Sequence, residues 1–215
     1  MNRYILRFSK TGNMRFISHL DLQRLFQRAI KRGDVKVAYS HGYNPHELIN
    51  IVQPLSLGYE GLEELFEIDT LIPYDCEDLK NRLNLALPEG ISFFSCTETE
   101  RKNQTTSCAT KNAVYEVVFN EDISQIIHLS EFLAQDIINI QKKNKKTGQL
   151  VEKDIKSLIN SVEMNGKTLI LDLACAGNAS LNPSNLLNSL FQFSGKEFSA
   201  ENCRITRVKL YRNEQ

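Results

Sequence analysis

The spacing of apolar residues over the first third of the chain predicts a strand and then a helix. Tyr4, Leu6 and Phe8 alternate with their neighbours, a period of two that is typical of a β-strand. Ser18 suits the N-cap of a helix, and apolar residues then recur at helical spacing as far as Gly33. The members of this helical stripe are Leu22, Leu25, Phe26, Ala29 and Ile30.

The same pattern continues to residue 98. Residues 35–39, 48–52 and 62–69 favour extended structure, and the last two are separated by the turn-like sequence G-Y-E-G. Asp75 introduces a second predicted helix, and residues 91–96 form a last strand. The predicted order is β-α-β-β-α-β, which is that of a ferredoxin-like unit, with two helices on one face of an antiparallel sheet.

Residues 99–112 are polar and aperiodic, as expected for a linker, and a similar rhythm follows them. A strand is predicted over 114–119, a helix over 122–135 with Ile126, Leu129 and Leu133 on one face, and a last strand over 203–211. Asn182 and Pro183 suit the cap and first turn of another helix. Residues 137–141, 150–160 and 167–175 supply the remaining pieces, of which 150–160 fits either a strand or a short helix.

These patterns predict an α+β protein built of two tandem ferredoxin-like (βαββαβ) units with antiparallel sheets. The predicted boundaries are a first domain over 1–98, a linker over 99–112 and a second domain over 113–215. A chain of 215 residues is long enough for two such units. Its apolar fraction of 41% and charged fraction of 24% are those of an ordinary globular protein.

The lack of a recognisable targeting signal and the scattered cysteines predict a cytoplasmic protein. The N-terminus lacks the apolar run of a signal peptide, and no stretch approaches the roughly 20 apolar residues of a membrane span. The five cysteines are scattered without a C-x-x-C pair, so they are predicted to be reduced thiols. Their spacing also excludes an iron–sulfur cluster, and no cofactor or metal is predicted.

Charge is unevenly distributed along a chain whose formal net charge is zero. Residues 1–46 hold nine Lys or Arg against two acidic residues, whereas residues 61–100 hold ten acidic residues against Lys80 and Arg82. Such an asymmetry predicts a basic face for an anionic partner, provided that these charges also cluster in space.

The octapeptide Y-S-H-G-Y-N-P-H at residues 39–46 is the densest group of binding-type side chains. Gly42 and the Asn44-Pro45 pair make it a turn between strands. One interpretation is a structural corner in which Tyr39 and Tyr43 pack. The other is a binding surface formed by Tyr39, His41, Tyr43 and Asn44, because bases stack on aromatic and histidine rings.

Two groups of cations are candidates for contact with RNA phosphates. Arg24, Arg28 and Lys31 are spaced so that they share one side of the first predicted helix. A loop carries the second group, which comprises Lys142, Lys143, Lys145 and Lys146. Both groups also fit ordinary solvated surfaces. The binding interpretation predicts an affinity for RNA that falls steeply with salt.

Catalytic motifs are absent from the sequence. It has no phosphate-binding loop, dinucleotide fingerprint, zinc-protease motif or serine-hydrolase elbow. His19, in the first helical turn, is expected to be a structural imidazole with satisfied hydrogen bonds. His41 and His46 make only a weak metal pair without a third ligand. The chain is therefore more readily explained as a binding protein than as an enzyme.

Three segments resemble a known family. They are R-F-S-K-T-G-N-M-R-F-I-S-H-L-D-L-Q-R-L-F-Q-R-A-I-K-R, A-Y-S-H-G-Y-N-P and P-L-S-L-G, with weaker echoes in V-E-K-D-I-K-S-L-I and R-V-K-L-Y. The chain resembles the radical-SAM-linked protein family, a bacterial domain of unknown function. The resemblance implies a partner, since members are encoded beside or fused to a cobalamin-binding-type radical SAM protein. His41 replaces a glutamine of the family pattern, and His46-Glu47 stands where a basic residue is common.

Three functional hypotheses follow. The leading one is a non-catalytic accessory protein that binds RNA or a ribosomal assembly and works with a separate radical SAM enzyme. The second is a metal-independent endoribonuclease related in fold to CRISPR repeat-cleaving enzymes, with His19, Tyr39 and His41 as candidates; this is an analogy of folds. The third is a protein–protein adaptor in which the acidic segment 63–78 docks a basic partner.

Overall fold

The computed structural model describes residues 1–100, 110–143, 148–177 and 179–212. It is an α+β protein whose strands pair mostly antiparallel, with four α-helices in the described residues. The chain divides into two compact units. The first comprises Met1–Ala109 and Arg207–Leu210, and the second comprises Thr110–Thr206 and Tyr211–Gln215.

The first unit contains six regular elements and one short 3-10 helix. In chain order they are β1 (Asn2–Lys10), the 3-10 helix η1 (Gly12–Phe16), α1 (His19–Arg32), β2 (Ile49–Ile51), β3 (Glu60–Thr70), α2 (Cys76–Asn84) and β4 (Ile91–Thr99). The predicted order of strands and helices is confirmed over this half of the chain. β1 lies between β3 and β4, and β2 pairs with β3, so the strand order is β4–β1–β3–β2 with antiparallel pairing throughout.

Local capping explains where the helices of this unit begin. The Ser18 side chain accepts a hydrogen bond from the backbone N–H of Asp21, and Asp75 caps α2 in the same manner. Gly33 ends α1 as predicted. These caps satisfy N–H groups that have no partner within the helix, and that is why each helix starts there.

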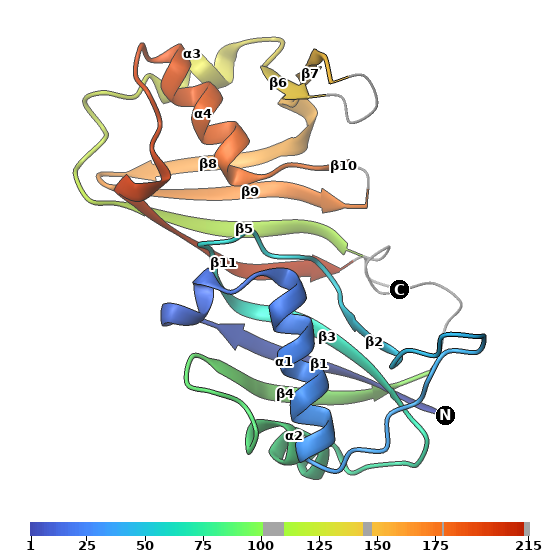
Figure 1. Cartoon of the computed structure of the whole chain (residues 1–215). Coiled ribbons are helices and arrows are strands. Elements are labelled where there is room, and N and C mark those ends of the chain that lie inside the picture. Colours follow the sequence, from blue (N-terminus) through green and yellow to red (C-terminus); the bar gives the residue numbers. More distant parts are fainter. Residues whose placement is uncertain (101–109, 144–147, 178, 213–215) are drawn as a thin grey trace. The chain divides into compact units, whose positions relative to one another are not determined.

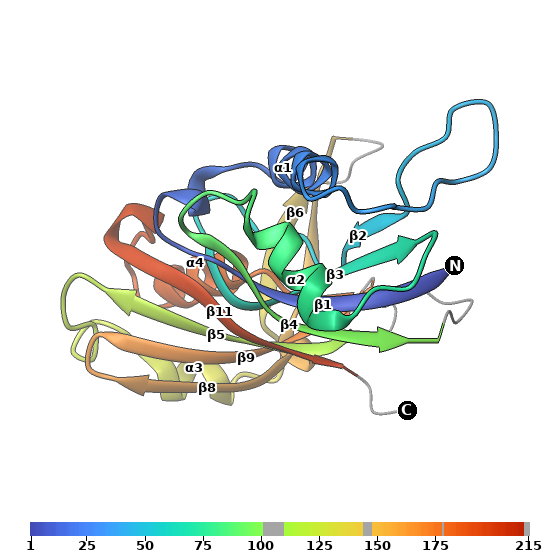
Figure 2. The same ribbon diagram turned by 90° about the horizontal axis from the view of Figure 1, so that it is seen from below.

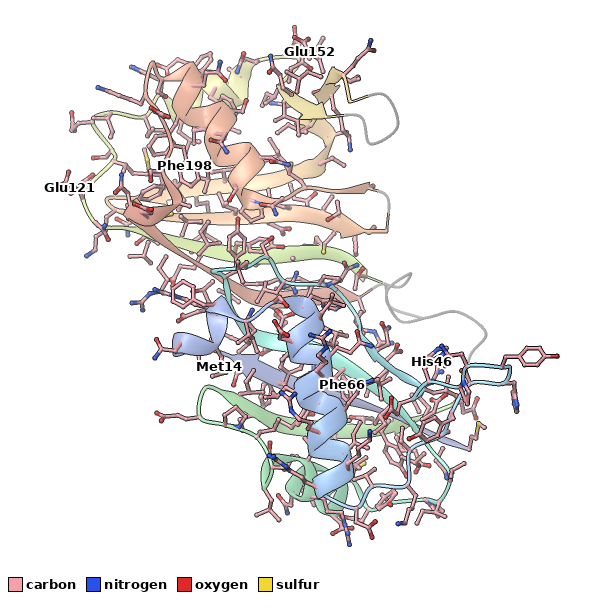
Figure 3. The ribbon with its side chains drawn as sticks, in the orientation of Figure 1. Met14, His46, Phe66, Glu121, Glu152 and Phe198 are labelled. Atoms are coloured by element: carbon pink, nitrogen blue, oxygen red, sulfur yellow. The ribbon has the colours of Figure 1, made fainter. Side chains whose placement is uncertain are left out.

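The core of the first unit lies between the sheet and one face of α1 and α2 (Figures 1 and 2). Phe8 of β1, Phe26 of α1, Phe66 of β3 and Phe93 of β4 are all buried, and their ring centroids lie 4.7–5.7 Å apart in the contacting pairs. Such aromatic pairs stabilise a core beyond the burial of their area. Figure 3 labels Phe66 within this cluster.

The second unit begins with β5 and adds a separate two-stranded hairpin. Its elements are β5 (Thr110–Phe119), α3 (Leu129–Ala134), β6 (Asn139–Lys143), β7 (Leu150–Asp154), η3 (Lys156–Leu158), β8 (Ile159–Asn165), β9 (Thr168–Ala176), β10 (Ala179–Ser180), α4 (Pro183–Phe193), η4 (Ala200–Asn202) and β11 (Cys203–Arg212). Of β11, Arg207–Leu210 belong to the first unit. β9 pairs with β5, β8 and β10, while β6 and β7 pair only with each other among the described strands.

The core of this unit forms between the alternating buried residues of β5 and β9 and the apolar face of α4. Phe119 at the end of β5 stacks on Phe191 of α4 with centroids 5.5 Å apart. Asn182 caps α4 and Pro183 occupies its first turn, which confirms the prediction for these two residues.

The predicted helix over 122–135 is wrong in its first half. The structure has a helix only from Leu129, and residues before it turn sharply because the Asp122 side chain accepts a hydrogen bond from the Ser124 N–H. Ile126, which was predicted to lie on the buried face, is exposed, whereas Phe132 is buried. The segment 150–160 contains both candidate structures: β7, the one-turn η3 and the start of β8.

The predicted domain boundaries stay predictions. Most of the predicted linker, residues 101–109, lies outside the described residues, and β5 already begins at Thr110.

Candidate nucleic-acid interface and a buried charged cluster

The octapeptide forms the tip of a closed loop between α1 and β2. At its base Tyr39 and Glu47 face each other as an isolated β-bridge, and the Ser40 N–H donates a hydrogen bond to the His46 carbonyl at 2.9 Å. The Ser40 hydroxyl lies 2.8 Å from Nδ1 of His46 and also accepts from the His46 N–H. The loop projects from its unit in Figure 2, and Figure 3 labels His46 in it.

The side chains at the loop tip are directed into solvent. Tyr43 is fully exposed and Tyr39 is 43% exposed, and His41 and Asn44 are exposed as well. The Tyr39 hydroxyl lies 3.5 Å from a carboxylate oxygen of Glu47. A structural corner in which both tyrosines pack therefore does not describe Tyr43, whose ring has no packing partner in the described part of its unit.

Glu47 connects the base of the loop to α1. Its carboxylate accepts a hydrogen bond from the Gln27 amide at 2.9 Å and lies 3.8 Å from Nζ of Lys31. The loop therefore lies beside the second half of α1. The exposed cations of α1 are Arg24, Arg28, Lys31 and Arg32, of which the first three are the predicted group. We call this the loop–helix surface; it consists of Arg24, Arg28, Lys31, Tyr39, His41, Tyr43 and Asn44.

The cations of this surface differ in their internal pairing. Arg24 lies 3.2 Å from Asp21 in an exposed pair, and Lys31 is paired at long range with Glu47. Arg28 has no ion pair to a described residue and lines a groove between α1 and α2, whose lining also includes Arg32, Arg82 and the acidic Asp34 and Asp78. The exposed pair of Arg24 and Asp21 contributes only about 0–1 kcal/mol, so a phosphate oxygen would displace this carboxylate readily.

Two of the four lysines in the second predicted group of cations lie outside the residues that the structure describes. Lys145 and Lys146 fall outside the described residues. Lys142 and Lys143 are the last residues of β6, where the backbone alone is described.

Ion pairs within the first unit neutralise part of the charge asymmetry along the chain. Cations of β1 pair with acids of β3: Arg3 with Asp69 at 2.7 Å, and Arg7 with Glu63 at 3.0 Å. The remaining acids of segment 63–78 are mostly engaged too, because Asp75 caps α2 and both Glu77 and Asp78 pair with cations of α2. Two cations of the basic segment, Arg3 and Arg7, thus pair with the acidic segment, while Glu77 and Asp78 stay exposed beside cations of their own helix. The adaptor hypothesis stays a prediction.

A buried charged cluster was missed by the sequence analysis. Glu64 of β3 binds Arg207 through both carboxylate oxygens, one of them 2.7 Å from Nε, and both side chains are almost completely buried. Lys10 at the end of β1 is 2% exposed. The signal was present in the sequence, since Lys10 continues the alternation Tyr4, Leu6, Phe8 and therefore falls on the core face of β1.

His19 belongs to this buried cluster and is not a satisfied imidazole. Its Nδ1 is buried and has no hydrogen-bond partner among the described residues, which corrects the expectation for this residue. It lies at the first residue of α1, whereas the loop contacts Lys31, roughly 18 Å further along the helix at 1.5 Å per residue. The structure therefore does not bring His19 together with Tyr39 and His41, as the endoribonuclease hypothesis requires.

Among the described residues, neither the cysteines nor any group of metal-binding side chains forms a second candidate site. Cys76, Cys96, Cys175 and Cys203 are free thiols. Burial raises the pKa of the Cys203 thiol to about 11, so that it is protonated at neutral pH and a poor nucleophile. No three His, Cys, Asp or Glu side chains among the residues described are arranged to hold a metal ion.

Together these observations define a two-unit α+β protein with an exposed aromatic loop beside a basic helix and a buried ionic cluster. Residues 3–183 match the model of a family described as an uncharacterized protein conserved in bacteria (DUF2344). Because this match covers most of the chain, the chain belongs to that family. The comparison with curated proteins finds no match. Among the described helices, none is long and apolar enough to cross a bilayer.

Proposed function

We propose that this chain is a non-catalytic, cytoplasmic accessory protein that binds RNA or a ribosomal assembly through the loop–helix surface. We further propose, from its resemblance to the radical-SAM-linked family, that it works with a separate radical SAM enzyme. The observation that carries the RNA-binding proposal is the complete exposure of the Tyr43 ring on a loop held against a helix with exposed cations.

Exposure of Tyr43 has a physical cost that binding would offset. A tyrosine ring in water leaves its apolar surface hydrated, and nothing in the first unit as described covers it. A base stacked on such a ring contributes about 1–3 kcal/mol and needs no particular sequence, because every base has a π-face. The closed loop base presents the ring from an ordered backbone, which limits the entropy lost on binding.

Cations beside the ring complete the proposed site. Arg28 is exposed without a carboxylate partner in the described residues, the pair of Arg24 and Asp21 is exposed and weak, and Lys31 lies as far as 3.8 Å from Glu47. The alternative surface for RNA, the face of β1 that points away from the helices, carries Arg3 and Arg7, but both are committed to carboxylates of β3. The loop–helix surface is therefore the better candidate for phosphate contact.

We propose a ferredoxin-like arrangement for each unit. In the first unit the order β-α-β-β-α-β and the sheet order β4–β1–β3–β2 support it. In the second unit β5, α3, β8, β9, α4 and β11 follow each other in the same order, with the β6–β7 hairpin inserted after α3.

RNA binding across a salt series, with EDTA present, tests the proposal. Tyr43→Ala is expected to weaken binding by about 1–3 kcal/mol, roughly fivefold to hundredfold, if one base stacks there. Arg28→Glu is expected to weaken binding and to flatten its salt dependence, because one phosphate contact is lost. The matched controls are Phe94→Ala, an aromatic that is 46% exposed on β4, and Arg204→Glu, an exposed arginine of the second unit.

Each outcome has a distinct meaning. Equal effects of the two alanine variants, or of the two charge reversals, would show that binding does not involve the loop–helix surface. RNA fragments in EDTA would favour an endoribonuclease instead. Co-purification of the radical SAM protein that survives ribonuclease treatment, without any RNA binding, would favour a pure adaptor.

A further inference from the structure

A small cavity lies at the N-terminal end of α1, at the opposite end of this helix from the loop contact. It is lined by Phe8, Lys10, His19, Leu22, Ile51, Leu55 and Glu64, all from the first unit. Its volume is about 10 Å³, which is room for about one water-sized atom. Most of its wall is apolar, so the polar groups that reach it determine what it binds.

Lys10 is the first of these groups. Its side chain is 2% exposed and lines the cavity, and it makes no hydrogen bond or ion pair to a described residue. An ammonium in a buried side chain without a partner is unfavourable, so such groups lose their proton or acquire an anion. Burial lowers the pKa of Lys10 from its ordinary value of 10.5; the Glu64 carboxylate opposes this shift and Arg207 adds to it.

His19 is the second group. Its ring lines the same cavity, and Nδ1 is buried without a partner in the part of the chain that the structure describes. Buried polar side-chain atoms normally have a hydrogen-bond partner, so each exception calls for an explanation. His19 is also the first residue of α1, and the N-terminal end of a 14-residue helix favours negative charge.

Glu64 does not supply the missing partner. Both of its oxygens bind Arg207, which also donates a hydrogen bond to the carbonyl of Gln53 at 2.7 Å. The pair of Glu64 and Arg207 is therefore neutral and internally satisfied. Lys10 and His19 remain as two potential donors that face one cavity, with no acceptor between them among the described residues.

We propose that this cavity is an oxyanion site in which one oxygen of a phosphate or carboxylate group accepts hydrogen bonds from Lys10 and His19. The anion supplies the charge that the buried ammonium lacks and the acceptor that the imidazole lacks. Because the cavity admits one atom, a single oxygen enters and the rest of the ligand stays outside the cavity.

The lining favours a small molecule with one anionic group over the backbone of a nucleic acid. An RNA tract brings a row of phosphates and needs a row of cations. Among the described residues of the lining, Lys10 is the one amine or guanidinium. The oxyanion site is therefore distinct from the loop–helix surface and independent of the RNA-binding proposal.

Nuclear magnetic resonance of the histidine side chains in the full chain tests the proposal directly. The chain has four histidines, and His128, which is exposed in the second unit, serves as the internal control. Inorganic phosphate and acetate, each titrated at constant ionic strength, are the probes. The ring nitrogen signals of His19 should shift and saturate with one probe or both while those of His128 do not, and the probe that acts at lower concentration identifies the ligand class.

Variants provide the second measurement. Lys10→Met keeps the length of the side chain without its charge, and Lys196→Met changes an exposed lysine of the second unit. Affinity for the active probe should fall at least about tenfold in Lys10→Met and stay unchanged in Lys196→Met. His19 signals that do not move, or that move without saturation together with those of His128, would overturn the proposal even if Lys10→Met fails to fold. Equal affinity in both variants would overturn it as well.

Discussion

Replacing Glu64 by Gln tests whether the buried ionic cluster holds the first unit together. The substitution keeps the volume of the side chain and one acceptor oxygen but removes its charge. Arg207 and Lys10, which are 3% and 2% exposed, then remain without the carboxylate charge beside them, while Arg207 keeps its hydrogen bond to the Gln53 carbonyl. Removal of one member of a buried ion pair costs about 3–5 kcal/mol, because an uncompensated charge stays buried.

Glu63, the preceding residue, is a matched control. Its carboxylate also pairs with an arginine, Arg7, but both side chains are more than a third exposed. An exposed pair contributes about 0–1 kcal/mol, so Glu63→Gln should change the free energy of unfolding by no more than that. Two adjacent and chemically identical substitutions are therefore expected to differ by a few kcal/mol through burial alone.

Urea denaturation followed by circular dichroism measures both variants. With slopes of about 1–3 kcal/mol per molar urea, Glu64→Gln should lower the unfolding midpoint by at least about 1 M, and Glu63→Gln by much less. A double variant, Glu64→Gln with Arg207→Met, should recover part of the loss, since it removes the uncompensated charge. Similar midpoints for the two single variants would refute the assignment of a stabilising role to the buried pair.

Three further predictions concern the first unit. Phe26→Ala should lower the free energy of unfolding by about 3–5 kcal/mol, measured by urea denaturation, because it leaves a cavity among the three rings that pack against Phe26. At pH values between the lowered pKa of Lys10 in the folded chain and its ordinary pKa of 10.5, the unfolded chain binds more protons than the folded chain, so the free energy of unfolding rises with pH. Urea denaturation of the unsubstituted protein and of Lys10→Met over this pH range should show the rise in the former and not in the latter. Gly90 has φ of +88°, and a Cβ there would lie 2.6 Å from the Thr11 carbonyl oxygen. Gly90→Ala should therefore lower the free energy of unfolding by about 1–3 kcal/mol, which thermal denaturation would show as a lower melting temperature.

Local signals were enough to predict the helices that begin at a good cap. Ser18, Asp75 and Asn182 each accept a hydrogen bond from a backbone N–H of the first turn, an interaction that depends on residues within three positions. The predicted helix over 122–128 is wrong because of the same kind of local hydrogen bond: the Asp122 side chain accepts from the Ser124 N–H and favours a tight turn. Apolar spacing could not distinguish these two outcomes.

The candidate sites depend on features of the three-dimensional structure that sequence patterns do not encode. The exposure of Tyr43 depends on where the loop emerges from its unit, and no pattern within the octapeptide encodes that. The neutralisation of Arg3 and Arg7 depends on the register of β1 against β3, which sets Arg3 opposite Asp69. Lys10 and Glu64 were accessible in principle, because both fall on the core side of their strands, but charge counting treated them as surface residues.

The partner of Glu64 lies 143 residues further along the chain. At a synthesis rate of about 5–20 residues per second, Arg207 is made roughly 7–30 s after Glu64. During that interval the nascent first unit contains a carboxylate on its core side without the guanidinium that neutralises it. Neutralisation of Glu64 by Arg207 is therefore a late event in biosynthesis, because it waits until this part of β11 has left the ribosome.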